Sequence, residues 1–175
     1  MTTHKISADF YDDSFKLIAI HSNLEDYALT YAINSSCRLH LKRMPNDLQA
    51  GENRMFSLFD WDDEINDVYW TLISNKCTVE EVVPSEGFFG NSTVFRTDHL
   101  VDEYKEVDYF FKMDGVCESM VMDQVKAINT IAKVITAYPV DVQTLKSTLD
   151  EINSNMEKLK KGVEQYQNSP IRFRK

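Results

Sequence analysis

The segment from Phe15 to His21 is apolar on both faces of an extended chain, with Lys16 as the exception. A strand with water on one face alternates apolar and polar residues, whereas a strand with protein on both faces is apolar throughout. The segment therefore predicts a central strand. A central strand requires neighbouring strands on both sides and covering elements on both faces of the sheet.

A helix is expected directly after this strand. Ser22-Asn23-Leu24-Glu25 is typical of a capping box, in which the hydroxyl accepts a backbone N–H and the carboxylate reaches back to the helix start. We expect this helix to end at about Asn34. Helical spacing places four residues on its inner face: Leu24, Tyr27, Ala28 and Tyr31. A second helix is expected at residues 116–130, with Val121, Val125 and Ile128 facing inward.

Several shorter segments have the period of two that is typical of strands. The expected strands are residues 38–42, 55–61, 68–74, 107–113 and 133–138. The acidic segment 62–67 would join two of them as a hairpin, and residues 80–92 would form a longer loop. The sequence therefore predicts an α+β fold: an antiparallel or mixed sheet of five to seven strands with two packed helices, plus a long C-terminal heptad helix.

The C-terminal region carries the most regular pattern in the chain. Apolar residues recur at alternating spacings of three and four: Val142, Leu145, Leu149, Ile152, Met156, Leu159, Val163 and Tyr166. This is the a/d seam of a heptad helix. The seam is narrow, because its e and g positions are largely polar, and this favours pairing with a second chain or a partner helix. Packing along the domain's own sheet is the alternative.

The charge of the chain changes where the heptad pattern begins. The 175 residues carry a net charge of −9; residues 1–139 hold 12 Lys and Arg against 23 Asp and Glu, whereas residues 140–175 hold 7 against 5. We divide the chain into an α+β core domain (1–140), a C-terminal heptad helix (141–168) and a basic tail (169–175). The acidic body argues against nucleic-acid binding through the general field of the protein.

Cysteine usage and hydropathy bear on the compartment. Cys37, Cys77 and Cys117 are spaced forty residues apart, which argues against a disulfide framework or a clustered zinc site. The N-terminal residues lack an apolar segment after a basic start, so no secretory signal is expected. The longest apolar run, Leu17 to Ile20, is far shorter than the roughly 20 residues that cross a membrane. We expect a cytoplasmic protein without a membrane partner and without a metal or other cofactor.

An acidic segment with aromatic neighbours is a candidate partner-binding site. Its residues are Asp60, Trp61, Asp62, Asp63 and Glu64. Aromatic anchors surrounded by charge suit binding surfaces, whereas the spacing lacks the central Gly and terminal Glu of a calcium-binding EF-hand loop. The segment is expected to be a solvated hairpin tip or a docking surface for a basic partner.

Two other polar clusters have weaker support. His21, Glu25 and Asp26 lie where a strand passes into a helix, and α/β proteins place ligands at such junctions; the simpler interpretation is a histidine hydrogen-bonded at the strand end. A basic stripe follows the first helix: Arg38, His40, Lys42 and Arg43. Without an aromatic platform beside it, the stripe is expected to be the solvent face of a strand.

The segment Val-Asp-Glu-Tyr-Lys-Glu-Val-Asp-Tyr at residues 101–109 resembles the motif that names the IPExxxVDY family of small Bacteroidetes proteins. Val101 and Asp102 stand where that family has Ile and Pro. Residues 17–34, 55–64, 70–77 and 134–138 resemble the same family. The resemblance implies a cytoplasmic bacterial protein and brings no activity, cofactor or catalytic residue with it. The motif residues taken as candidates are Val101, Glu103, Val107, Asp108 and Tyr109.

The sequence contains no glycine-rich phosphate loop, nucleophile elbow or HExxH zinc motif. It favours a non-enzymatic interaction or regulatory protein that binds a protein partner, or a second copy of itself, through the C-terminal helix. Two alternatives stay open. One is an enzyme with an unfamiliar site near His21, Glu25 and Asp26, and the other is an RNA-associated factor that uses the basic stripe and tail. Asp108 and Lys112 share a strand face and are expected to form a structural pair.

Overall fold

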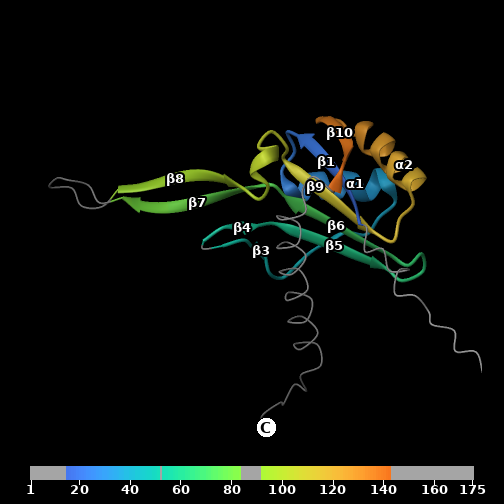
Figure 1. Cartoon of the computed structure of the whole chain (residues 1–175), viewed down its shortest axis with the longest axis horizontal. Coiled ribbons are helices and arrows are strands. Elements are labelled where there is room, and N and C mark those ends of the chain that lie inside the picture. The colour runs from blue at the N-terminus through green and yellow to red at the C-terminus, as the bar shows by residue number, and fades with distance from the viewer. Residues whose placement is uncertain (1–14, 52, 84–91, 143–175) are drawn as a thin grey trace, which may run out of the picture.

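The computed structural model describes residues 15–51, 53–83 and 92–142. This part of the chain forms a six-stranded antiparallel sheet, two helices and two smaller two-stranded sheets (Figure 1). The predicted α+β class is confirmed, as are the number of strands in the main sheet and the two packed helices. The predicted C-terminal helix and basic tail lie outside the described residues, apart from Asp141 and Val142.

The main sheet has the strand order β10-β1-β9-β6-β5-β2. In that order the strands are β10 (Val134–Val140), β1 (Lys16–Ser22), β9 (Tyr109–Asp114), β6 (Val68–Ser74), β5 (Leu58–Asp63) and β2 (Lys42–Arg43). The helices are α1 (Asp26–Cys37) and α2 (Glu118–Asn129). The two smaller sheets pair β3 (Leu48–Gln49) with β4 (Met55–Phe56), and β7 (Lys76–Val83) with β8 (Ser92–His99).

Strand β1 is central, as its apolar sequence predicts. Ile18 pairs with Phe111 of β9 on one side and with Pro139 of β10 on the other. Ile18 belongs to the core on the helix side of the sheet, whereas Leu17 and Ala19 belong to the core on the opposite side. All three residues are buried because both faces of the strand are covered.

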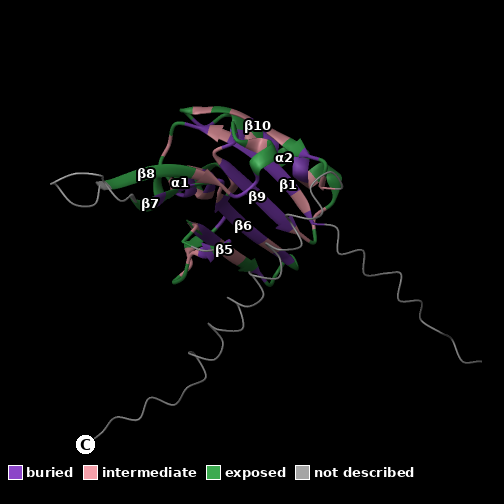
Figure 2. Cartoon of the chain, turned by 60° about the vertical axis from the view of Figure 1, so that its left-hand side comes forward, coloured by how far each residue is buried: buried purple, intermediate pink, exposed green. Residues whose placement is uncertain are grey.

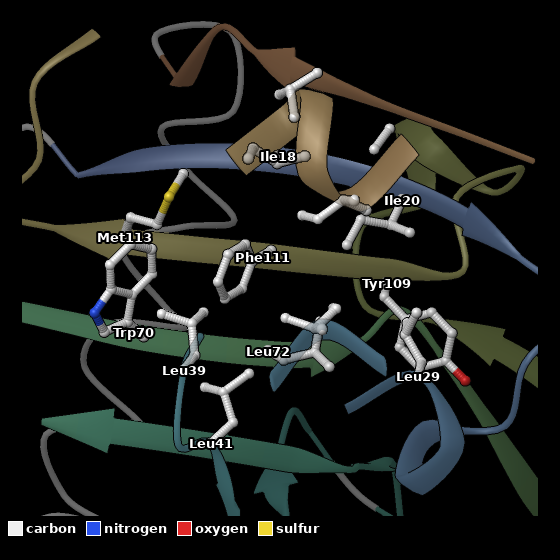
Figure 3. Close-up of a cluster of buried hydrophobic side chains, with 14 of the residues drawn as sticks. Ile18, Ile20, Leu29, Leu39, Leu41, Trp70, Leu72, Tyr109, Phe111 and Met113 are labelled. Carbon is white, nitrogen blue, oxygen red and sulfur yellow. The ribbon is translucent and has the colours of Figure 1, made fainter. Parts of the chain in front are cut away.

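Both helices lie on one face of the sheet and contact each other. Helix α1 connects β1 to β2, and α2 connects β9 to β10; in each case the two strands are parallel but are not neighbours. The core beneath the helices is shown in Figure 3. Its members include Ile18, Ile20, Leu29, Ile33, Leu72, Phe111, Val121, Val125 and Ile128. The predicted inner face of the second helix is therefore confirmed.

The inner face predicted for the first helix is wrong. Tyr27 and Tyr31 are 64% and 78% exposed, whereas Leu29, Thr30 and Ile33 are buried. The buried face of α1 is the one that carries Leu29 and Ile33, which lie one turn apart and have fully apolar side chains. The tyrosines lie on a different face of the helix.

The capping box is also absent from the start of α1. The Ser22 hydroxyl accepts a hydrogen bond from the backbone N–H of Leu24 at 3.1 Å, and the helix begins only at Asp26. Glu25 occupies the N-cap position without a side-chain hydrogen bond to the helix. The serine therefore stabilises the turn that leaves β1 rather than the first turn of the helix.

The opposite face of the sheet is covered by β3, β4 and the chain around the short 3₁₀ helix Asp102–Tyr104. Phe56 of β4, Val101 and Val107 pack there against Phe110 of β9. Val142, the last described residue, packs against the same core. The two cores together explain why the central strands are apolar on both faces.

Other strand predictions need correction. Of the predicted strand 38–42 only Lys42 is paired, in β2 together with Arg43, because Leu39 and Leu41 cover the helix-side core instead. The predicted strand 55–61 is divided between β4 and β5. Residues 80–83 and 92, predicted as loop, belong to β7 and β8, which form a ribbon that projects from the body (Figure 1).

Candidate functional site

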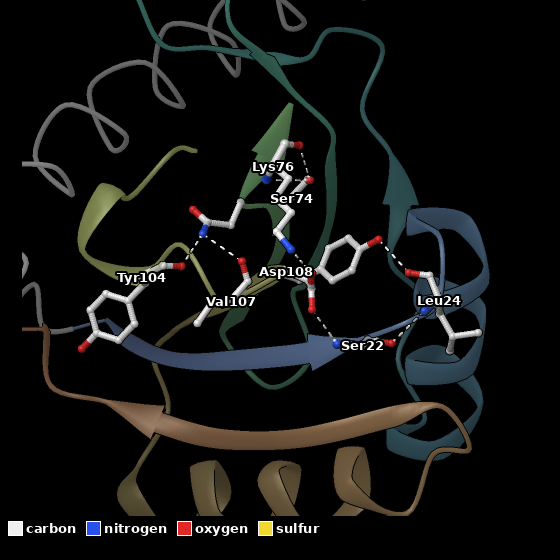
Figure 4. Close-up of polar contacts among 9 residues, drawn as sticks. Ser22, Leu24, Ser74, Lys76, Tyr104, Val107 and Asp108 are labelled. Atoms are coloured by element: carbon white, nitrogen blue, oxygen red, sulfur yellow. Dashed lines mark hydrogen bonds and ion pairs between the residues drawn. The ribbon is translucent and has the colours of Figure 1, made fainter. Parts of the chain in front are cut away.

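The motif residues Asp108 and Tyr109 hold the junction of β1 and α1 through hydrogen bonds to Ser22 and Leu24, and we call this pair the junction clamp; Figure 4 shows Asp108 beside Ser22. One carboxylate oxygen of Asp108 accepts the backbone N–H of Ser22 at 2.9 Å, and the other accepts the ammonium of Lys76 at 2.5 Å. The Tyr109 hydroxyl donates to the backbone oxygen of Leu24 at 2.8 Å. All of these groups are engaged within the protein, so the clamp fixes the chain rather than presenting a reactive carboxylate.

The expected Asp108–Lys112 pair is wrong. Asp108 pairs with Lys76 at the start of β7, and Lys112 pairs with Asp114 at 2.6 Å. The Lys112 ammonium also lies 4.7 Å from the centre of the Phe15 ring. Four residues of extended chain span about 13 Å, which is too far for a direct ion pair along one strand face. A two-residue spacing, as between Lys112 and Asp114, is within reach.

Asn75 connects the motif to the sheet, and it was not among the residues predicted from the sequence. It is fully buried between β6 and β7. Its side chain accepts the backbone N–H of Val101 at 2.9 Å and donates to the backbone oxygens of Tyr104 and Val107 at 2.8 and 2.9 Å. The sequence could have indicated this role, because an amide directly after the apolar strand β6 is expected to be buried and buried amides need hydrogen-bond partners.

The motif is therefore largely architectural. Val101 and Val107 are buried in the core opposite the helices, while Glu103 is exposed in the 3₁₀ helix. Burial raises the pKa of the Tyr109 phenol, and the nearby charges of Asp26, Glu25 and Asp108 raise it further. A phenol held neutral in this way suits its role as a hydrogen-bond donor.

His21 points to the sheet face opposite the helices and has a structural partner. Its Nε2 lies 3.3 Å from the Tyr138 hydroxyl, and the two rings stack with centroids 5.8 Å apart. Among the described residues, no group of three or more His, Cys, Asp or Glu side chains is arranged to hold a metal ion. The interpretation of His21 as a histidine hydrogen-bonded at the strand end is therefore the one that the geometry supports.

The acidic segment is divided between the two faces of β5. Asp60 lies opposite Lys42 of β2 and accepts a hydrogen bond from the Tyr69 hydroxyl. Burial, this hydrogen bond and the charges of nearby carboxylates, Asp62 among them, raise the pKa of the Tyr69 phenol. Trp61 is half-buried on the helix side, with the His40 ring edge-on at 5.1 Å. The segment does not form one continuous acidic surface.

The prediction that the whole acidic segment is a solvated tip is wrong for Asp63. Asp63 is 7% exposed, and its carboxylate accepts the Asn66 side-chain amide at 2.7 Å. Strand β5 runs through Asp63, so the turn consists of residues 64–67, with Glu64 exposed as predicted. The buried carboxylate shapes this turn, whereas Asp62 and Glu64 face solvent.

The basic stripe has the aromatic neighbours that its sequence lacks. The Arg43 guanidinium lies 5.4 Å from the centre of the Phe59 ring and pairs with Asp47. Lys42 lies opposite Asp60 in the register of β2 and β5, and both Arg38 and Lys42 are exposed. The expectation that no aromatic side chain lies beside the stripe is therefore wrong, while Arg43 itself is engaged within the protein.

The β7–β8 ribbon is largely exposed (Figure 2) and carries three exposed apolar side chains. Val82, Val94 and Phe95 are 58%, 48% and 68% exposed. Arg96 pairs with Asp98 on the same strand at 2.8 Å and with Glu81 across the ribbon at 3.8 Å. This surface was not predicted from the sequence, although the β-branched and aromatic residues of β8 are typical of a strand.

The predicted heptad surface cannot be placed. Its residues Leu145, Leu149, Ile152, Met156, Leu159 and Val163 lie outside the described residues. In the described ranges, no helix has the length and apolar character needed to span a membrane. Comparison of the chain with protein-family models, with curated proteins and with solved structures gives no match.

Proposed function

We propose that the chain is a non-enzymatic, cytoplasmic protein-interaction protein. The observation that carries the proposal is the projecting β7–β8 ribbon, on which Val82 and Phe95 are exposed on one face and Val94 on the other. Exposed apolar side chains that share a face, as Val82 and Phe95 do, are typical of interaction sites. The heptad segment of residues 142–166 supplies a second interaction element, which pairs with a partner helix or with a second copy.

The candidate reactive groups support a non-catalytic role. His21 contacts Tyr138, and Asp108 contacts Ser22 and Lys76, so both are engaged within the body. Catalytic groups are usually placed where a substrate reaches them. No specific observation favours the enzyme alternative or the RNA alternative. The relation to the IPExxxVDY family stays a prediction, and the motif's buried valines are consistent with a structural motif.

The heptad interaction is tested with one substitution in the seam. Ile152→Asp places a charge at a d position, where burial against a partner is costly. Light scattering of the full-length protein is expected to give a mass above the 20.3 kDa of one chain, and this substitution is expected to lower it. Ser154→Asp adds the same charge outside the seam and should leave the mass unchanged.

Two results would contradict this part of the proposal. One is a full-length protein that is monomeric and cross-links to no other protein in its own cells. The other is a fall in the melting temperature of the whole domain on Ile152→Asp with no change in mass, which would place the heptad residues on the protein's own sheet.

A further inference from the structure

The edges of the main sheet are closed by specific features. An open edge strand exposes backbone N–H and C=O groups to which another chain can add. On β10, the Asn129 carboxamide accepts the N–H of Ala137 at 2.9 Å and donates to its C=O at 2.8 Å. Pro139 has no N–H, and the register with β1 shifts so that Ile135 is an extra residue. Each feature removes or displaces pairing groups along β10.

The other edge is closed in a related way. Strand β2 has only two residues, Lys42 and Arg43, and both are charged. The Asn34 carboxamide of α1 accepts the N–H of the preceding Leu41 at 2.9 Å and donates to its C=O at 3.0 Å. Each helix thus carries an asparagine whose carboxamide hydrogen-bonds to the backbone N–H and C=O of the edge segment that follows the helix.

The ribbon lacks these protections on its β8 side. Its strands pair without a register shift from Lys76–His99 to Val83–Ser92. The β7 edge carries Glu80 and Glu81, and β7 also contacts β4. Strand β8 contains neither Pro nor Lys, and no side chain of the described residues hydrogen-bonds to the backbone of residues 93–97. Of these edge strands, β8 is the one that is regular and whose outward backbone groups at residues 93–97 have no partner among the described residues.

We propose that β8 pairs antiparallel with β8 of a second copy, centred on Phe95. The resulting sheet has four strands, β7-β8-β8-β7, related by a twofold axis. Such an interface uses the same surface on both copies, and strand addition supplies main-chain hydrogen bonds. Strand β8 contains none of the heptad residues, so the two interactions are tested with separate substitutions.

The sequence of β8 is self-complementary in this register. Thr93, Phe95 and Thr97 share one face, so Phe95 lies opposite Phe95 of the second copy and Thr93 lies opposite Thr97. Aromatic pairs and threonine pairs are favourable across antiparallel strands. On the other face Val94 lies opposite Arg96, whose aliphatic stem can cover it.

Charge disfavours one alternative register and one alternative pairing. Centring the pair on Arg96 would place two arginines opposite each other, whereas the Phe95 register opposes no like charges. A second pairing of β7 with β7 near Glu80 and Glu81 would bring glutamates together. An isolated two-stranded ribbon is marginal in water, and the added strands also reduce the exposure of Phe95.

The test uses the full-length chain carrying Ile152→Asp, so that the heptad does not contribute. Phe95→Lys would place the lysines of the two copies opposite each other at the twofold axis, which disfavours the dimer. Within one chain the new lysine lies opposite Glu80, so the ribbon itself should be preserved. Val82→Lys is the matched control, since Val82 has similar exposure and lies on the same ribbon face but on β7. Light scattering is expected to give twice the 20.3 kDa of one chain for the parent and the control, and once for Phe95→Lys.

A cross-linking variant keeps the proposal falsifiable if the lysine disturbs the ribbon. In a Cys117→Ser background, Phe95→Cys should form a disulfide-linked dimer under mild oxidation, and Val82→Cys should not. A monomeric Ile152→Asp parent at its highest soluble concentration overturns the proposal. Equal cross-linking at both positions, or binding of β8 to a different protein in place of a second copy, also overturns it.

Discussion

The six-stranded sheet and the β7–β8 ribbon are both antiparallel, yet their surroundings are opposite. The sheet is buried on both faces, and each of its edge segments is occupied by an asparagine, Asn129 or Asn34. The ribbon has exposed apolar residues and an open β8 edge. The difference indicates that the sheet provides the stability of the domain, whereas the ribbon is available for interaction.

The largest expected effect separates two phenylalanines. Phe111 is fully buried against Trp70, with ring centroids 5.6 Å apart, whereas Phe95 is 68% exposed. Phe111→Ala should lower the free energy of unfolding by about 3–5 kcal/mol. Phe95→Ala should change it by less than about 0.5 kcal/mol at low protein concentration, where association contributes nothing. Urea denaturation measures both, and equal losses would contradict the division between sheet and ribbon.

The next effect concerns the connection between the sheet and the motif. Asn75→Ala leaves the backbone N–H of Val101 and the oxygens of Tyr104 and Val107 without this partner. We expect a loss of about 3 kcal/mol in the free energy of unfolding, because these groups are inside the protein. Asn46→Ala, at an exposed turn, is the control and should stay within about 0.5 kcal/mol. A small loss for Asn75→Ala would mean that residues 101–109 keep their position without the hydrogen bonds of Asn75.

The correctly predicted features are those in which burial of one or both faces produces a recognisable pattern of apolar residues within a short segment. Strand β1 is apolar throughout because both of its faces are covered, and α2 shows its inner face because Val121, Val125 and Ile128 are its regularly spaced apolar residues. The β5–β6 hairpin was predictable for the same reason. These signals are contained in about a dozen consecutive residues.

The features that sequence reasoning missed depend on residues distant in the chain. Asn75 bonds to Val101, and Asp108 to Ser22, across separations of 26 and 86 residues. The ribbon projects from the body, so no core imposes a clear alternation on it. Helix α1 misled the prediction because its tyrosines have apolar rings but face solvent. The candidate site was therefore less predictable than the fold.

A smaller effect is expected from opening the closed edge. Asn129→Ala removes both hydrogen bonds to the backbone of Ala137. The free energy of unfolding should fall by about 1 kcal/mol, and light scattering should show added, concentration-dependent association through β10. Asp123→Ala, an exposed change on the same helix, is the control. If association does not increase, the bulge and Pro139 are enough to close this edge.

A similar effect, which vanishes at high pH, is expected at Tyr109 in the body of the protein. Burial, followed by the charges of Asp26 and Glu25, raises the pKa of Tyr109 above its usual value of 10.0 in the folded protein. Above pH 10 the unfolded chain loses this proton while the folded protein keeps it, so the free energy of unfolding falls as the pH rises. The contribution is complete below pH 10 and is lost as the pH rises through the folded pKa.

Tyr109→Phe should remove this part of the slope. At pH 8 the variant should be less stable by about 1 kcal/mol, because the hydrogen bond to Leu24 is lost. Above pH 10 its stability should approach that of the parent, since only the parent bears the cost of keeping the phenol protonated. Urea midpoints across this range measure the convergence. Parallel curves for the two proteins would show that Tyr109 ionises as readily in the folded protein as in the unfolded chain, and would place the junction clamp in contact with water.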